Sequence, residues 1–167
     1  MTTKYIRNQH RFLVFSDSIQ HKHFADNVLR GKLIHGAGFM QVDVIDGVLT
    51  PKCFGESESL RKGPRRDCAR DIVESIGMKE DSPTKYIIYR GKVVIFWHEL
   101  SHEEVSEAAF FGSIDCESAG FMNMSISENG SINIKCFGES ECGMAKARDG
   151  DNKRIAELLG LDVELLV

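Results

Sequence analysis

The residues best suited to chemistry occur in pairs, because one short string is repeated along the chain. The string KCFGESE stands at residues 52–58 and again at 135–141. Between a strand and a helix, glycine supplies unusual backbone angles, serine donates hydrogen bonds, and backbone N–H groups commonly face an anion. The pattern therefore predicts a duplicated loop for a ligand or partner, formed by Gly55, Glu56, Ser57, Gly138, Glu139 and Ser140. The alternative is a structural turn whose glutamates are solvated.

A histidine lies at the start of the first predicted helix in each copy, as His21 and His102. A histidine that faces a pocket can act as a general base or a nucleophile. The alternative is a polar residue in the first turn of a helix. The spacing of His21 and His23 fits neither a helical metal pair nor a zinc signature, so we predict no metal site, and nothing in the sequence implies a cofactor.

The two loops differ in the charge around them. Each carries two carboxylates, which repel a phosphate unless nearby cations offset them. Four basic residues follow the first loop and two follow the second: Arg61, Lys62, Arg65 and Arg66 against Lys146 and Arg148. If only one copy binds an anion, the sequence favours the first.

These residues belong to a tandem repeat of about 80 residues. KYI stands at residues 4–6 and 85–87, and AGFM at 37–40 and 119–122. Hydrophobic patterning in each copy indicates two strands, a helix, two strands and a helix. In the second copy, Ser101 and Glu104 form a capping box, Asn129-Gly130 suits a hairpin turn, and Gly160 suits a helix end.

This pattern predicts an α+β fold, made of two pseudo-symmetric β-β-α-β-β-α repeats at residues 1–81 and 82–167. An 80-residue unit buries only a modest core. We therefore expect one compact domain overall, in which the halves either share one sheet or pack face to face. The apolar tail, residues 161–167, should add a last strand or an oligomer contact.

The order of residues in one unit resembles the Janus family, the family of the phosphohistidine phosphatase. KYI resembles the opening strand of that family, and FGES resembles its Y-G-x-S phosphate loop. The resemblance implies a catalytic role for His21 or His102, with Lys4 or Lys85 and Ser57 or Ser140 holding phosphate. The family's G-G-G-R segment is A-G-F-M here, so its arginine has no counterpart in either copy.

Composition narrows the function classes. The 167 residues are 42% hydrophobic and 28% charged, as is usual for a globular chain, and no apolar run approaches the roughly 18 residues of a membrane span. The net charge of −4 makes nucleic acid an unlikely partner, because general nucleic-acid binders are usually basic. No signal-peptide core opens the chain, and five cysteines without a C-x-x-C pair suit a reducing compartment, so we expect a cytoplasmic protein.

Together these features predict a small binding or adaptor protein, with a protein partner or a small anionic ligand at the FGES loops. The alternative is an enzyme that cleaves phosphohistidine or phosphoesters with a first-helix histidine. Convergence of that histidine, the KYI lysine and the FGES serine on one pocket would favour the enzyme. A third interpretation is a structural protein that forms a homo-oligomer, such as a homodimer, through the apolar tail.

Overall fold

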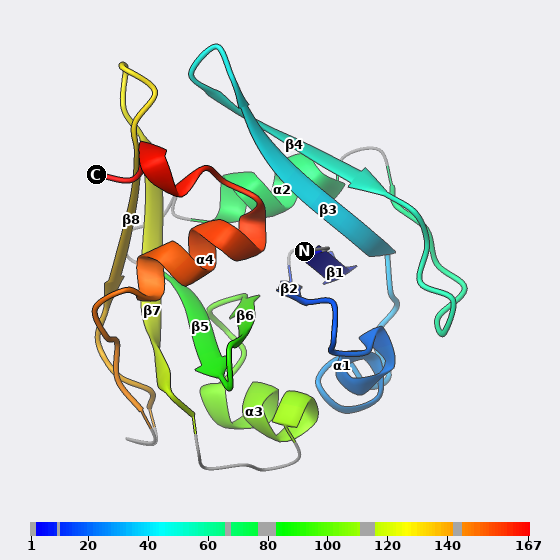
Figure 1. The fold of residues 1–167 in the computed structure, drawn as a ribbon. Helices are drawn as coiled ribbons and strands as arrows, with labels where there is room; N and C mark the ends of the chain where they lie inside the picture. The colour runs from blue at the N-terminus through cyan, green and yellow to red at the C-terminus, as the bar shows by residue number, and fades with distance from the viewer. Residues whose placement is uncertain (1–2, 10, 66–67, 77–82, 111–115, 142–144) are drawn as a thin grey trace.

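Eight strands form one curled antiparallel sheet in the described part of the chain (Figure 1). The computed structural model describes residues 3–9, 11–65, 68–76, 83–110, 116–141 and 145–167. The strands are β1 (Thr3–Asn8), β2 (Arg11–Ser16), β3 (Gly36–Ile45), β4 (Val48–Phe54), β5 (Thr84–Tyr89), β6 (Lys92–Phe96), β7 (Ser118–Ile126) and β8 (Ile132–Phe137). The helices are α1 (His21–Asn27), α2 (Cys68–Ser75), α3 (His102–Phe110) and α4 (Asp151–Leu159), followed by a 3₁₀ turn, η1 (Val163–Leu165).

The sheet is joined at its centre by strands from the two halves of the chain. The strand order is β4-β3-β1-β2-β6-β5-β7-β8, so β1–β4 lie on one side of the β2–β6 seam and β5–β8 on the other. At the seam Val14 faces Ile95, Leu13 faces Phe96 and Phe15 faces Val94. The halves therefore share one sheet.

The predicted fold class, α+β with two packed β-β-α-β-β-α repeats, is wrong. The chain is mostly a single curled antiparallel sheet, shaped like half of a barrel, and its four described helices have only seven to nine residues each. The physical reason lies at the seam. An unpaired strand edge exposes a row of N–H and C=O groups, and pairing β2 with β6 satisfies the inner edge of both halves at once.

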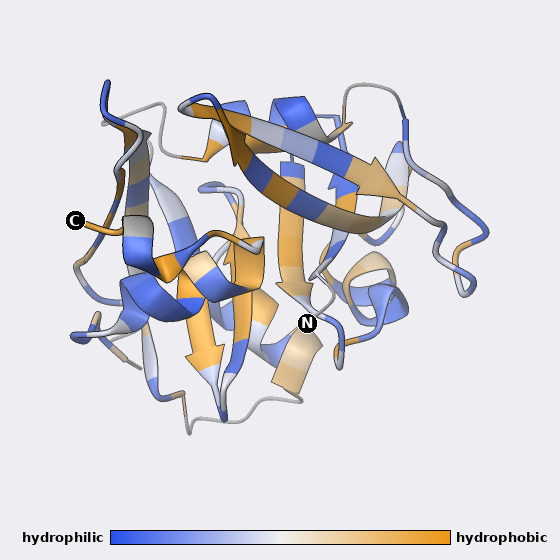
Figure 2. Cartoon of the chain, turned by 45° about the horizontal axis from the view of Figure 1, so that its top comes forward, coloured by the Kyte–Doolittle hydropathy of each residue, from blue (hydrophilic) through white to orange (hydrophobic). Residues whose placement is uncertain are grey.

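Two hydrophobic cores lie on opposite faces of this sheet. The first packs α2 and α4 against one face, and the second packs α1 and α3 against the other. Figure 2 shows apolar residues concentrated in the central strands, whereas the β3–β4 hairpin alternates between polar and apolar positions. Alternation of this kind places one set of side chains in a hydrophobic core and exposes the other set to solvent.

The local signals for helix ends are confirmed. The Glu104 backbone N–H donates to Ser101 Oγ at 3.0 Å, and the Ser101 N–H donates to Glu104 Oε2 at 2.9 Å, which is the predicted capping box. Helix α4 ends at Gly160, whose φ of 75° is the left-handed conformation of a C-cap. None of the helices in the described ranges is long and apolar enough to cross a membrane.

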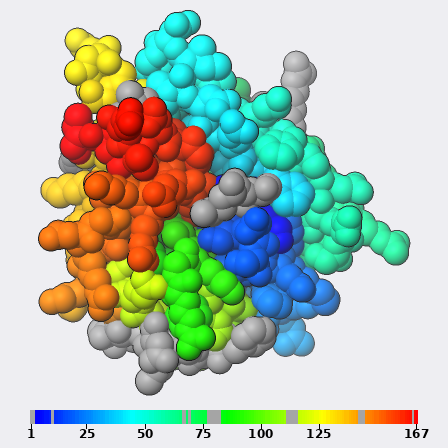
Figure 3. Space-filling model, in the orientation of Figure 1, coloured from blue at the N-terminus to red at the C-terminus, as the bar shows by residue number. Residues whose placement is uncertain are grey.

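The last segment of the chain ties the two halves together. Helix α4 packs against β3 of the other half, and the Thr3 hydroxyl donates to the Leu158 carbonyl. Figure 3 shows this orange segment in contact with the cyan first-half strands. The apolar tail then pairs within the chain, because the Val167 N–H donates to the Ile132 carbonyl of edge strand β8 at 3.0 Å.

Equivalent tyrosines in the two halves have different hydroxyl partners, which gives a stability prediction. Tyr86 donates to the buried carboxylate of Asp151 at 2.6 Å, and Ser118 donates to the same carboxylate at 2.8 Å. The Tyr5 hydroxyl lies beside two thiols and has no oxygen or nitrogen partner among the described residues. We expect Tyr86→Phe to lower the free energy of unfolding by about 2 kcal/mol, and Tyr5→Phe by less than about 0.5 kcal/mol.

Urea unfolding of both variants measures this difference, with Tyr5→Phe as the matched control. Each substitution removes one hydroxyl from a fully buried ring and keeps the ring itself. Equal losses of stability in the two variants would contradict the importance of the Tyr86–Asp151 hydrogen bond.

Candidate functional site

A row of matching side chains crosses the sheet in each half. In the first half, Phe15, Lys4, Phe39 and Phe54 are direct cross-strand neighbours on β2, β1, β3 and β4. In the second half the same row is Phe96, Lys85, Phe121 and Phe137. Directly opposed residues in antiparallel strands lie on the same face of the sheet. Each lysine is therefore set among aromatic rings on the face covered by α1 and α3.

The glycine of FGES has a backbone role in holding this row. Gly55 has a φ of +64°, and a Cβ placed there would lie 2.8 Å from the Phe39 ring. Gly138 repeats the arrangement with a φ of +77° and a distance of 2.9 Å to the Phe121 ring. A larger residue at either position would be strained and would displace the ring. Both glycines thus shape the loop by allowing the chain to pass close to an aromatic side chain.

The glycine of AGFM orients the histidine. Nε2 of His21 lies 3.0 Å from the Gly38 carbonyl, and Nε2 of His102 lies 3.0 Å from the Gly120 carbonyl. A carbonyl only accepts, so the proton of each ring sits on Nε2. Nδ1 is then the ring nitrogen available to the loop side.

In the first half these residues line an open pocket. Lys4, His21, Phe39 and the loop residues 56–59 surround a hollow of about 350 Å³, together with Gln20. Nζ of Lys4 donates to the Asp17 carbonyl at 2.5 Å and the Ile19 carbonyl at 3.1 Å, so one of its three N–H groups remains for a ligand. Nδ1 of His21 has no side-chain partner among the described residues. Burial, and then the Lys4 charge, lower the pKa of His21 below its ordinary value of 6.5, so its ring is neutral at pH 7.

In the second half the equivalent place is filled by the chain itself. The Glu141 carboxylate forms an ion pair with Lys85 and lies 2.5 Å from Nδ1 of His102. It also accepts from the His102 backbone N–H at 3.3 Å. Partial burial opposes ionisation, but the hydrogen bonds from Lys85 and His102 lower the pKa of Glu141 to about 2. The carboxylate is therefore charged at neutral pH.

The loop serines hold the two loops closed. The Ser57 N–H donates to the Lys62 carbonyl at 2.7 Å, and the Ser140 N–H donates to the Ala145 carbonyl at 2.9 Å. Both side chains are buried, and Ser57 lines the pocket beside Ser59, with 3.3 Å between their hydroxyl oxygens. The structure thus brings Lys4, His21 and Ser57 to one pocket.

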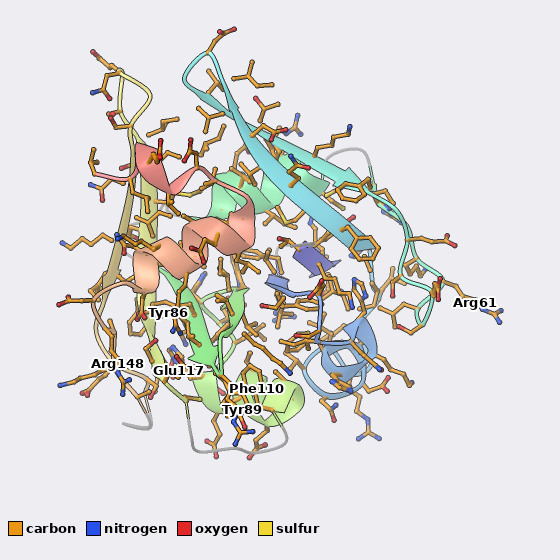
Figure 4. All side chains as sticks on the ribbon, viewed as in Figure 1. Arg61, Tyr86, Tyr89, Phe110, Glu117 and Arg148 are labelled. Atoms are coloured by element: carbon orange, nitrogen blue, oxygen red, sulfur yellow. The ribbon has the colours of Figure 1, made fainter. Side chains whose placement is uncertain are left out.

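The basic residues after the loops lie elsewhere. Arg61 projects from the loop away from the sheet, and Arg148 lies near Glu117 beside β7 (Figure 4). Of the first basic group, Lys62 and Arg65 also do not line the described pocket, and Arg66 lies outside the described residues. The positive charge of the pocket comes from Lys4. Glu56 and Glu58 line it as well and contribute negative charge.

The sequence interpretation missed the second glutamate of each loop and the aromatic rows. The sequence prediction places Glu139 and Ser140 in the second loop site but leaves out Glu141, the counterpart of Glu58. A signal was present in the repeat, because Lys, His and this Glu recur together at equivalent positions in both copies. A lysine and a buried histidine that face one loop favour a carboxylate of that loop as their partner.

The chain matches no protein-family model, no curated protein and no solved structure. In the parts of the chain that the structure describes, no group of three or more His, Cys, Asp or Glu residues is placed to hold a metal ion. The features that bear on function are therefore the open pocket of the first half and its filled counterpart in the second half.

Proposed function

We propose that the chain is a small binding protein whose working site is the first-half pocket, with Lys4 and His21 as the anion-binding residues. One observation carries the proposal. In the second half, a carboxylate sits on the equivalent lysine and histidine, with Glu141 bound to Lys85 and His102. This internal ion pair supports an anion site at the equivalent place in the first half. The first half offers the same two side chains without an occupant from the described part of the chain.

The pair formed by Lys4 and His21 suits a ligand better than a purely structural role. Lys4 is held by two backbone carbonyls and His21 by a third, so both are oriented before a ligand arrives. Preorganised groups lose little conformational entropy on binding. Phe15 and Phe39 flank the His21 ring edge-on, at centroid distances of 5.4 Å and 6.2 Å, and restrict its rotation.

Titration with acetate, followed through the histidine ring signals in NMR spectra, tests this site. We expect acetate to shift the signals of His21 and leave those of His102 unchanged, because Glu141 already occupies the second place. Lys4→Met should abolish the His21 shift by removing the fixed positive charge. Lys85→Met, the matched variant in the second half, should leave the His21 shift intact.

Circular dichroism should first show that both variants are folded, so that a lost shift is not a consequence of unfolding. A His21 shift that survives Lys4→Met contradicts the assignment of Lys4. No shift of His21 with either acetate or inorganic phosphate overturns the proposed function.

A second candidate is hydrolysis of a phosphohistidine or phosphoester, favoured by the convergence of Lys4, His21 and Ser57 on one pocket. The neutral His21 ring carries a lone pair on Nδ1, as a base or nucleophile requires. Phosphate release from phosphohistidine that is lost in His21→Gln would establish this activity. The two glutamates that line the pocket oppose a phosphate, so binding is the better-supported function.

A further inference from the structure

We infer that the ligand of the first-half pocket is an aromatic monocarboxylate, a single carboxylate attached to an aromatic ring. This inference rests on the proposed function and specifies its ligand class. Three features carry it: the group that fills the second site, the charges around the first site, and an exposed aromatic pair next to it.

The first feature is the chemistry of the internal occupant. The Glu141 carboxylate bridges Lys85 and Nδ1 of His102 and takes a backbone N–H as its third donor. A planar group with two oxygens satisfies this set, because one oxygen pairs with the lysine and the other meets the histidine. The equivalent lysine and histidine both line the open pocket of the first half, where a carboxylate from outside can reach them.

The second feature is the charge balance of the open pocket. Lys4 contributes one positive charge, and Glu56 and Glu58 contribute two negative charges. Protonation of His21 brings the sum to zero, which a monoanion tolerates. Inorganic phosphate carries more than one negative charge at neutral pH and meets stronger repulsion from both glutamates. The surroundings therefore favour a carboxylate over a phosphate.

The third feature is an aromatic shelf, formed by Phe39 and Phe54, beside the anion position. The two rings stack with centroids 6.0 Å apart and planes at 23°. They line an open hollow of about 560 Å³ that shares Lys4 and Phe39 with the anion pocket. Phe54 is 40% exposed, which is unusual for a phenylalanine in a sheet and leaves ring surface for a ligand.

The second half shows the same shelf partly covered. Phe121 and Phe137 stack with the same centroid distance of 6.0 Å, but Nζ of Lys135 lies 6.0 Å from the centre of the Phe137 ring. In the second site, Glu141 therefore occupies the anion position and Lys135 lies over part of the shelf. In the first half both remain open to the same ligand, whose carboxylate and ring would lie side by side.

Calorimetric titration with phenylacetate, acetate, phenylacetamide and inorganic phosphate tests the ligand class. We expect phenylacetate to bind roughly tenfold more tightly than acetate, because its ring packs on the shelf. Phenylacetamide, which keeps the ring and loses the charge, should bind at least tenfold more weakly than phenylacetate. Phosphate should bind no more tightly than acetate. Phe54→Ala should reduce the affinity for phenylacetate to that for acetate, whereas Phe137→Ala, its counterpart, should have no effect.

Each contrary result has a distinct meaning. If phenylacetate binds no better than acetate, or if phosphate binds better than both, the aromatic carboxylate is the wrong ligand class while the anion site stands. If phenylacetamide binds as tightly as phenylacetate, the charge is not recognised and the inference fails. If no anion binds or shifts His21, the proposed function fails together with the inference.

Discussion

Replacing Glu141 with alanine should give the protein a second binding site for phenylacetate. The substitution removes the internal carboxylate from Lys85 and His102, and both are held by backbone carbonyls that the change does not touch. Calorimetry should then report two sites per chain where the unaltered protein has one, and the His102 ring signals should begin to respond to the ligand. Glu139→Ala, which removes an exposed carboxylate of the same loop, is the control and should keep one site.

The same variant should also be less stable without ligand, since it leaves the Lys85 ammonium and the His102 ring without the carboxylate that pairs with them. His102 is fully buried and the Lys85 side chain is 12% exposed, so water replaces the lost carboxylate contacts poorly. Phenylacetate should raise the melting temperature of Glu141→Ala more than that of the unaltered protein. A variant that melts normally and still binds one ligand would show that Glu141 does not occupy an anion site.

Binding of the carboxylate to the first site should be accompanied by uptake of a proton on His21. In the free pocket Nε2 donates to the Gly38 carbonyl, and Nδ1 is unprotonated because burial and Lys4 lower the pKa of the ring. A carboxylate on Nδ1 needs a donor there, so the complex contains the charged ring. Affinity should rise roughly tenfold for each unit by which the pH falls, between the pKa of His21 in the complex and its lower pKa in the free protein.

The free protein should respond to pH in the opposite direction. The pKa of His21 in the folded chain lies below its ordinary value of 6.5, so the folded state binds fewer protons than the unfolded state. This histidine therefore contributes stability above pH 6.5, and the contribution is lost as the pH falls toward the folded pKa. The charged groups that face the ring across the pocket are Lys4, Glu56 and Glu58. Acidification should thus destabilise the empty protein and tighten the complex.

Calorimetry in two buffers of different ionisation enthalpy measures the proton uptake directly, and it should approach one proton per ligand between the pKa of His21 in the free protein and that in the complex. His21→Gln keeps a polar side chain that cannot titrate and should remove the pH dependence of binding. Binding that is independent of pH in the unaltered protein, or equally pH-dependent in His21→Gln, would contradict the role given to Nδ1.

The local elements could be predicted from the sequence because their causes are local. The capping box at Ser101 and Glu104 and the helix end at Gly160 depend on residues within one turn. The fold class could not be predicted in the same way. Pairing of Val14 with Ile95 joins segments about 80 residues apart. No local sequence pattern predicts that the edge strands β2 and β6 of two separate hairpins will pair.

The candidate site, like the fold, could be predicted from the sequence only in part. The equivalent positions of lysine, histidine and serine in the repeat indicated residues that do converge in the first half. The difference between the halves could not be derived, because FGESE is identical in both copies. Glu58 lines an open pocket while Glu141 reaches its lysine and histidine, and this depends on the local packing of a side chain, not on its identity.

Glu141 contacts His102, whereas His21 has no carboxylate partner among the residues that the structure describes. One molecule therefore contains the same kind of histidine both with and without a bound carboxylate. The His102 ring signals are an internal standard for a histidine of this type in contact with a carboxylate, recorded in the same tube and at the same temperature. A ligand that fits the first site should move the His21 signals toward those of His102. Candidate compounds can then be ranked by how closely the two sets of signals converge, without any assay of activity.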